Sequence, residues 1–76
     1  MSVKAYILAN VEVGMGEEVF AALSGIEGIT SAHNVTGPYD VIALVEVPDT
    51  AALGELVVNE IQLIDGIGYT LTCVVM

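Results

Sequence analysis

The chain has 76 residues, 55% of them hydrophobic, and carries one basic residue against ten acidic ones, for a formal net charge of −9. A domain this small buries too little apolar surface to be comfortably stable alone, and a lone cysteine, Cys73, excludes an intramolecular disulfide. The acidity excludes direct binding to nucleic acid, because that affinity comes mainly from Lys and Arg side chains that neutralise phosphates.

Neither a membrane span nor a targeting segment is evident in the sequence. The charge-free apolar stretches are about 10 residues long, whereas a membrane helix needs about 20. The N-terminal residues MSVKAYILAN lack the charged start and the Ala-x-Ala cleavage site of a signal peptide. We therefore expect a soluble, cytoplasmic protein without membrane contact. So much apolar sequence in so small a domain also predicts a buried interface between subunits.

The first half of the chain predicts a strand followed by a short helix. The strand is expected to begin at Val3. Glu17 and Glu18 stand in the first turn of the helix, where the helix dipole favours negative charge. The apolar stripe of this helix consists of Val19, Phe20, Leu23 and Ile26. Gly25 and Gly28 then mark its end.

The middle of the chain predicts two strands joined by a turn. The strands are ITSAHNV at residues 29–35 and VIALVEV at residues 41–47, and TGPYD at residues 36–40 connects them. The segment VIALV is apolar on both faces of a strand, as a central strand must be when both sides of its sheet are covered.

The last third predicts a helix and a final strand. Asp49 is the candidate N-cap of an amphipathic helix of about four turns. Its stripe at helical spacing is Leu53, Leu56, Val57, Glu60, Ile61 and Ile64, apolar in all but Glu60. In the strand that follows, Gly68, Thr70 and Thr72 share one face, and Tyr69, Leu71 and Cys73 share the other.

An internal repeat predicts how these elements are arranged. The segment ANVEV from Ala9 resembles ALVEV from Ala43, and IEGI from Ile26 resembles IDGI from Ile64. Two βαβ halves, about 3–36 and 39–76, therefore predict one α+β domain over residues 1–76 with the ferredoxin-like order βαββαβ. Such a fold has a four-stranded antiparallel sheet with both helices on one face. The other face must be covered from outside the chain, and a homodimer that packs sheet against sheet is the simplest solution.

The turn TGPYD allows two interpretations. Gly37 can adopt a positive φ and leave backbone N–H groups approachable, while Asp40 supplies an acceptor at the start of a central strand. Exposed N–H donors suit a carboxylate and a fixed Asp suits an ammonium group, which are the two ends of a free amino acid. Alternatively, the segment is a hairpin turn whose Asp caps its own backbone.

Other residues that could take part in binding or catalysis also have two interpretations. The hydroxyls of Thr70 and Thr72 could bind a ligand, or these threonines simply favour a half-exposed strand. His33 is interpreted as a surface or interface residue and Cys73 as a small buried hydrophobe. No Ser-His-Asp or Cys-His set and no zinc-like cluster is evident, so we expect no catalytic residue, metal or cofactor.

The segment VTGPYDVIALVEV, followed after an amphipathic helix by IDGIGYTLTCVV, resembles the ligand-binding domain of the Lrp/AsnC family of transcription regulators. The resemblance covers nearly all of the chain. Its most specific elements are the Gly-x-x-Asp of Gly37 and Asp40 and the ending Gly-Ile-x-x-Thr-x-Thr, which includes Thr70 and Thr72.

This resemblance implies a domain that dimerises through its sheet, assembles further into tetramers or octamers, and binds small effectors, typically amino acids, between dimers. It assigns ligand contacts to Gly37, Tyr39 and Asp40, and secondarily to Thr70 and Thr72. Full-length members carry a helix-turn-helix domain ahead of this one, whereas here the first strand is expected two residues after Met1. We therefore expect a stand-alone form that does not contact DNA itself and acts through a partner, for example by co-assembly with a full-length relative.

Two functions of other classes remain open. One is a dimeric α+β barrel enzyme, which would place His33 in an enclosed apolar cavity within each protomer. The other is a structural partner subunit that binds no ligand.

Overall fold

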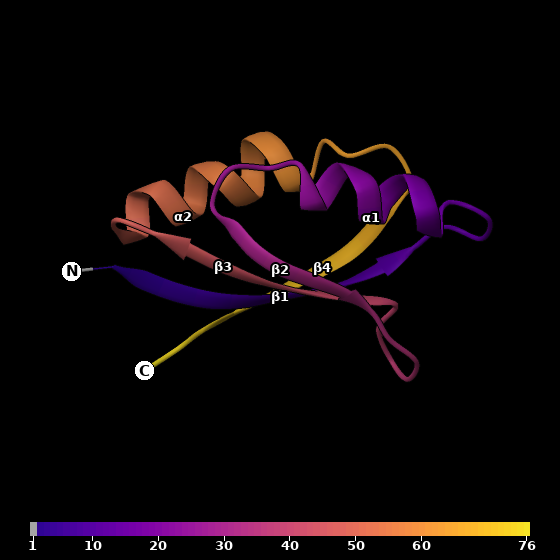
Figure 1. The fold of residues 1–76 in the computed structure, drawn as a ribbon, viewed down its shortest axis with the longest axis horizontal. Coiled ribbons are helices and arrows are strands. Elements are labelled where there is room, and N and C mark those ends of the chain that lie inside the picture. The colour runs from indigo at the N-terminus through magenta and orange to yellow at the C-terminus, as the bar shows by residue number, and fades with distance from the viewer. Residues whose placement is uncertain (1) are drawn as a thin grey trace.

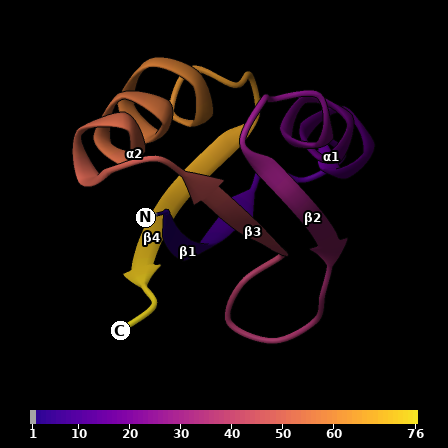
Figure 2. The same cartoon turned by 60° about the vertical axis from the view of Figure 1, so that its left-hand side comes forward.

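The computed structural model describes residues 2–76 and has the predicted element order. The strands are β1 (Val3–Val11), β2 (Ile29–Asn34), β3 (Val41–Val47) and β4 (Ile67–Val74). The helical segments are α1 (Gly16–Ser24), α2 (Thr50–Leu56) and a π-helical continuation of α2, η1 (Val57–Ile61). The strands form one antiparallel sheet in the order β2-β3-β1-β4, and both helices cover the same face (Figure 1; Figure 2). The predicted ferredoxin-like plan is confirmed.

The core lies between the helices and one face of the two central strands. In β1 and β3 alternate residues are buried, which places Ala5 opposite Val45 and Ile7 opposite Ala43 on the helix side. Burial of these residues fixes the register, because a slip by one residue would turn the whole apolar set to solvent. The buried hydrophobic residues are Ala5, Ile7, Ala9, Val19, Leu23, Val41, Ala43, Val45, Val47, Leu53, Leu56 and Ile61.

The two halves of the sequence repeat make the same contacts. The turn after each helical segment contains a glycine with positive φ, Gly28 at 104° and Gly66 at 92°. The carbonyl oxygen of Gly28 accepts a hydrogen bond from the Glu46 N–H at 2.8 Å, and that of Gly66 accepts one from the Glu12 N–H at 2.8 Å. The repeat predicted from the sequence is therefore present in the backbone hydrogen bonds.

The second helix begins as predicted and ends differently. Asp49 caps it, since its side-chain oxygen accepts a hydrogen bond from the Ala52 N–H at 2.8 Å. The expected four-turn α-helix instead changes to a π-helix at Val57, where the Gln62 N–H bonds to the Val57 oxygen at 2.9 Å. The wider π turn accounts for the interruption of the apolar stripe, because Ile61 is fully buried while Glu60 is exposed.

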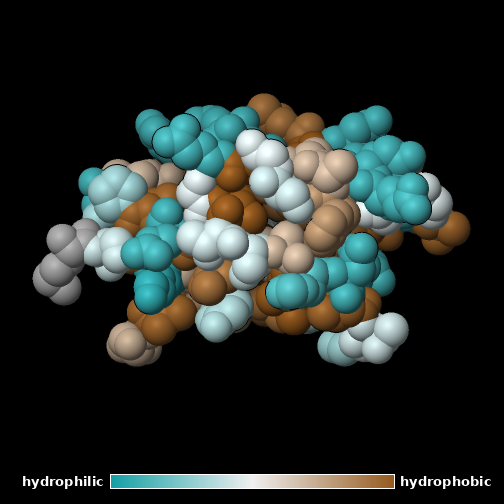
Figure 3. Space-filling view, in the orientation of Figure 1, coloured by the Kyte–Doolittle hydropathy of each residue, from teal (hydrophilic) through white to brown (hydrophobic). Residues whose placement is uncertain are grey.

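The open face of the sheet, defined here by Tyr6, Leu8, Ile42, Leu44 and Leu71, carries apolar side chains that no helix covers. Tyr6 is 46% exposed and Leu71 is 37% exposed. In Figure 3 hydrophobic surface is visible along the lower margin of the molecule, on the side away from the helices. Among residues 2–76, no helix is long and apolar enough to cross a membrane.

Candidate functional site

The loop between β2 and β3 projects from the sheet on the side away from the helices (Figure 1; Figure 2). The Val35 N–H donates to the Asp40 carbonyl oxygen at 2.9 Å and closes the hairpin. Within the loop Gly37 has a φ of 125°, which L side chains rarely adopt. Space is not the constraint at this position, because a Cβ there would meet nothing within 4 Å. The backbone conformation therefore accounts for this glycine.

Three hydrogen bonds hold the loop against the end of β1. The Val11 N–H donates to Asp40 Oδ2 at 2.8 Å, and the Asp40 N–H donates to the Ala9 carbonyl oxygen at 2.9 Å. The side-chain amide of Asn10 donates to the Pro38 carbonyl oxygen at 2.9 Å. Asp40 thus binds the backbone of a distant strand, rather than capping its own turn. Neither sequence interpretation included Asn10 or Val11, since nothing in the local sequence pairs them with this loop.

A cavity of about 280 Å³ lies beside this anchored carboxylate. It is lined by Val11, Glu12, Val13, Gly14, Gly16, Asn34 and Asp40. Its polar groups are suited to both ends of a zwitterion. Glu12 and Asp40 can accept hydrogen bonds from an ammonium group. Gly16 is the first residue of α1, and the first backbone N–H groups of a helix, which lack helical partners, can bind an anion.

The predicted ligand contacts do not all meet in this cavity. Of the five, only Asp40 lines it; Gly37 and Tyr39 lie elsewhere in the loop. Thr70 and Thr72 pair with Ala9 and Ile7 of β1 and are half-buried on the helix side. Strand β1 separates β4 from β3, so two inter-strand spacings, about 10 Å, divide Thr70 from the start of β3. Within one chain the threonines and Asp40 therefore form separate groups.

The residues considered for other chemistry do not form a site. His33 and Cys73 are exposed, and by register they lie on the open face beside Ile42 and Tyr6. The expectation that Cys73 is buried is wrong for the single chain, because β4 is an edge strand whose open side no helix covers. Neither cavity described here is lined by His33, contrary to the enzyme alternative. Among residues 2–76, no group of three or more His, Cys, Asp or Glu residues is arranged to hold a metal ion.

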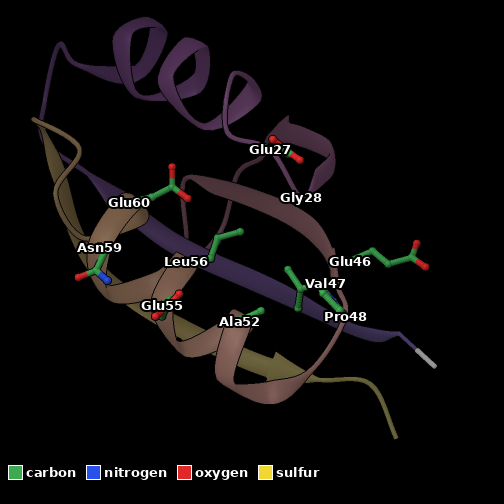
Figure 4. A pocket seen from close by; sticks show the side chains of 10 residues that line it. All are labelled: Glu27, Gly28, Glu46, Val47, Pro48, Ala52, Glu55, Leu56, Asn59 and Glu60. Atoms are coloured by element: carbon green, nitrogen blue, oxygen red, sulfur yellow. The ribbon is translucent and has the colours of Figure 1, made fainter.

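A larger hollow of about 470 Å³ lies between α2 and the turn that precedes β2 (Figure 4). Three separate segments contribute to its wall: the turn at residues 27–28, the end of β3 at residues 46–48, and residues 52–60 of α2 and η1. We call it the α2 hollow. The sequence pattern did not indicate a site here, because these segments are far apart in the chain.

Comparison with known proteins identifies the family. The profile described as Lrp/AsnC ligand binding domain matches residues 4–76. An HTH-type transcriptional regulator of Pyrococcus furiosus is 27% identical over 73 residues, which are 92% of this chain and 49% of that protein. The chain thus spans about half the length of this curated relative.

Solved structures show the same fold. A Thermus thermophilus protein has a TM-score of 0.93 and 26% identity, with 97% of this chain and 92% of that chain covered. Escherichia coli AsnC has a TM-score of 0.92 and 28% identity, with 97% of this chain and 50% of that chain covered. A Neisseria meningitidis transcriptional regulator, solved as a complex with L-Met, shares the fold at a TM-score of 0.90 and 17% identity, over 97% of this chain and 49% of that chain. By its matched residues and its fold, this chain belongs to the Lrp/AsnC ligand-binding domain family.

Proposed function

We propose that this domain is an oligomeric sensor of a free amino acid, or of a similar zwitterion, and that the ligand binds beside Asp40. The observation that carries the proposal is the fixed position of the Asp40 carboxylate, whose Oδ2 is held by the Val11 N–H at 2.8 Å. A fixed carboxylate oxygen at the edge of a cavity is a ready acceptor for an ammonium group.

The family supports an effector of this class. The Neisseria meningitidis regulator with the same fold was solved with L-Met, a free amino acid. In this chain the cavity of about 280 Å³ contains Asp40 and Glu12 at one side and the first residue of α1, Gly16, at another. An amino acid placed between them would present its ammonium group to the carboxylates and its carboxylate to the N–H groups at the start of α1.

Assembly completes the proposed site. The open face of the sheet is apolar, and we propose that it is buried against a second copy to form a dimer. Gly37 and Tyr39 lie in a projecting loop outside the cavity, so we propose that they contact a ligand bound between dimers, as do Thr70 and Thr72. A ligand shared by two dimers stabilises only the assembled form, the tetramer or octamer, and its concentration thereby sets the assembly state.

The proposed output is regulation of transcription through other proteins in the cytoplasm. The chain has one basic residue and ten acidic ones, which repel the phosphate backbone of DNA. We therefore propose that the sensor co-assembles with a full-length Lrp/AsnC relative that supplies the DNA contacts, and that it catalyses no reaction.

Thermal unfolding against a panel of the free amino acids, with molar mass measured by light scattering on the same samples, tests the proposal. A ligand at 100 times its dissociation constant adds about 2.7 kcal/mol per site. A domain of this size shifts by about 4 to 8 °C for each kcal/mol. We expect one amino acid, or a small group, to raise the melting temperature and the mass together. No shift with any amino acid, and one fixed mass, would overturn the proposal in favour of a structural subunit.

A further inference from the structure

The α2 hollow combines an apolar floor with a carboxylate rim. Val47 and Leu56 of the floor are 7% and 5% exposed, and Ala52, which also lines the hollow, is half-buried. Figure 4 shows Leu56 and Ala52 on the helix and Val47 on β3 across from it, with Glu55 and Glu60 along the helix and Glu27 on the turn. The three rim glutamates are exposed; Glu27 belongs to the turn before β2, and Glu55 and Glu60 belong to the continuous helix of α2 and η1.

The fourth glutamate at the hollow does not belong to the rim. Glu46 lines it through its position at the end of β3, but its side chain extends away from the hollow in Figure 4. Its Oε2 accepts a hydrogen bond from the Ser2 hydroxyl at 2.8 Å. The carboxylates available to a partner are therefore those of Glu27, Glu55 and Glu60.

Among residues 2–76, no lysine or arginine lines the α2 hollow. The one lysine or arginine of the chain is Lys4. It pairs with Glu46 in the β1–β3 register, and both lie on the face of the sheet that the helices do not cover. A second copy of the chain brings nine further net negative charges and the same single lysine, so self-association at this surface is electrostatically unfavourable. Nucleic acid is excluded by the same sign of charge. The complementary occupant is basic.

We propose that the α2 hollow is a docking site for a basic segment of another protein. Lysine or arginine head groups of that segment meet Glu27, Glu55 and Glu60, and their aliphatic stems, or an apolar residue between them, cover Ala52 and Leu56. A segment of protein fits better than a small free ligand, because most of the lining is exposed and the hollow does not enclose its contents. This site is separate from the cavity at Asp40 and does not depend on the amino acid proposal.

The test uses the whole chain and a fluorescent peptide of alternating lysine and leucine, with a peptide of alternating glutamate and leucine as the negative probe. The hollow variant is Glu27→Gln, Glu55→Gln and Glu60→Gln combined. The matched control combines Glu17→Gln, Glu18→Gln and Asp65→Asn. It also removes three negative charges, but from exposed positions outside the hollow. We expect the wild type to bind the lysine peptide alone, the hollow variant to bind it about tenfold or more weakly, and the control to bind within about twofold of wild type.

A second variant, Ala52→Lys, tests the floor and does not depend on the glutamates. It places a cation in the hollow on a helical residue, so we expect loss of peptide binding with an unchanged circular dichroism spectrum. Equal weakening by the hollow variant and its control would overturn the proposal, because the peptide would then respond to net charge alone. Wild-type binding of spermidine that is lost in the hollow variant, without binding of the peptide, would also overturn it, in favour of a small-cation site.

Discussion

Asp40 Oδ2 lies 2.8 Å from the backbone nitrogen of Val11 and accepts its hydrogen bond, joining two residues that stand 29 positions apart. This contact ties the β2–β3 loop to the last residue of β1 and fixes the carboxylate at the edge of the cavity. Asp40 therefore has two separable properties: its oxygen supports the fold, and its negative charge is the proposed partner of a ligand ammonium group.

Asp40→Asn separates these two properties. The asparagine oxygen still accepts the Val11 hydrogen bond, so we expect the melting temperature without ligand to stay within about 2 °C of wild type. Loss of the charge should weaken amino acid binding about tenfold or more, since a hydrogen bond to a charged group contributes about 1.5–3 kcal/mol. Calorimetric titration with the amino acid found in the thermal panel measures this. The control variant is Asp49→Asn, which also removes one negative charge, but at a helix cap, and should leave the affinity for the amino acid unchanged. If Asp40→Asn binds the amino acid with wild-type affinity, Asp40 is not part of the site.

Gly66 is expected to tolerate a side chain less well than Gly14. Both have positive φ, so alanine costs each about 1–2 kcal/mol in backbone strain. A Cβ on Gly66 would also lie 2.8 Å from Met15 Cβ, whereas a Cβ on Gly14 would meet nothing within 4 Å. Urea unfolding should therefore show a larger loss of free energy for Gly66→Ala than for Gly14→Ala. Equal losses would mean that Met15 moves aside freely.

Ile61 should contribute most of the stability of the π-helical segment. Its side chain is 0% exposed, and Ile61→Ala should reduce the free energy of unfolding by about 2–5 kcal/mol through lost burial and a residual cavity. Val58→Ala, in the same segment but at a side chain 56% exposed, should cost less than about 0.5 kcal/mol. Chemical denaturation of the two variants compares them directly. A large loss from Val58→Ala would show that Val58 is covered in an assembly.

Leu44→Lys should disrupt dimerisation without unfolding the chain. Leu44 is half-buried at the centre of the open face, and a lysine there would place a charge in the proposed dimer interface. We expect light scattering to report a lower mass at a given concentration, while the circular dichroism spectrum keeps its shape. Leu63→Lys, at a side chain 74% exposed beyond η1, serves as the control and should keep the wild-type mass. A wild-type mass for Leu44→Lys would place the interface elsewhere.

Much of the fold was predictable because its determinants are local. The run VIALV, apolar on both faces of a strand, indicated that residues 41–47 form a central strand. Asp49 indicated where the second helix starts, and its side chain caps the Ala52 N–H. The repeated segments IEGI and IDGI occupy equivalent turns, each with its glycine at positive φ. The end of the second helix was predicted less well, because periodicity alone does not distinguish an α turn from a π turn.

Local patterns were sufficient to predict the order of the elements and the family, since apolar patterning, capping and turn chemistry act between residues close together in the chain. Three relationships could be seen only in the folded chain: Asp40 binds Val11, Thr70 and Thr72 lie across β1 from the loop, and Glu27, Glu55 and Glu60 line one hollow. Each of these depends on strand register and on helix placement over the sheet. Both are set by the joint burial of residues such as Ile7, Ala43 and Leu56, which are distant in sequence and interact only once the chain has folded.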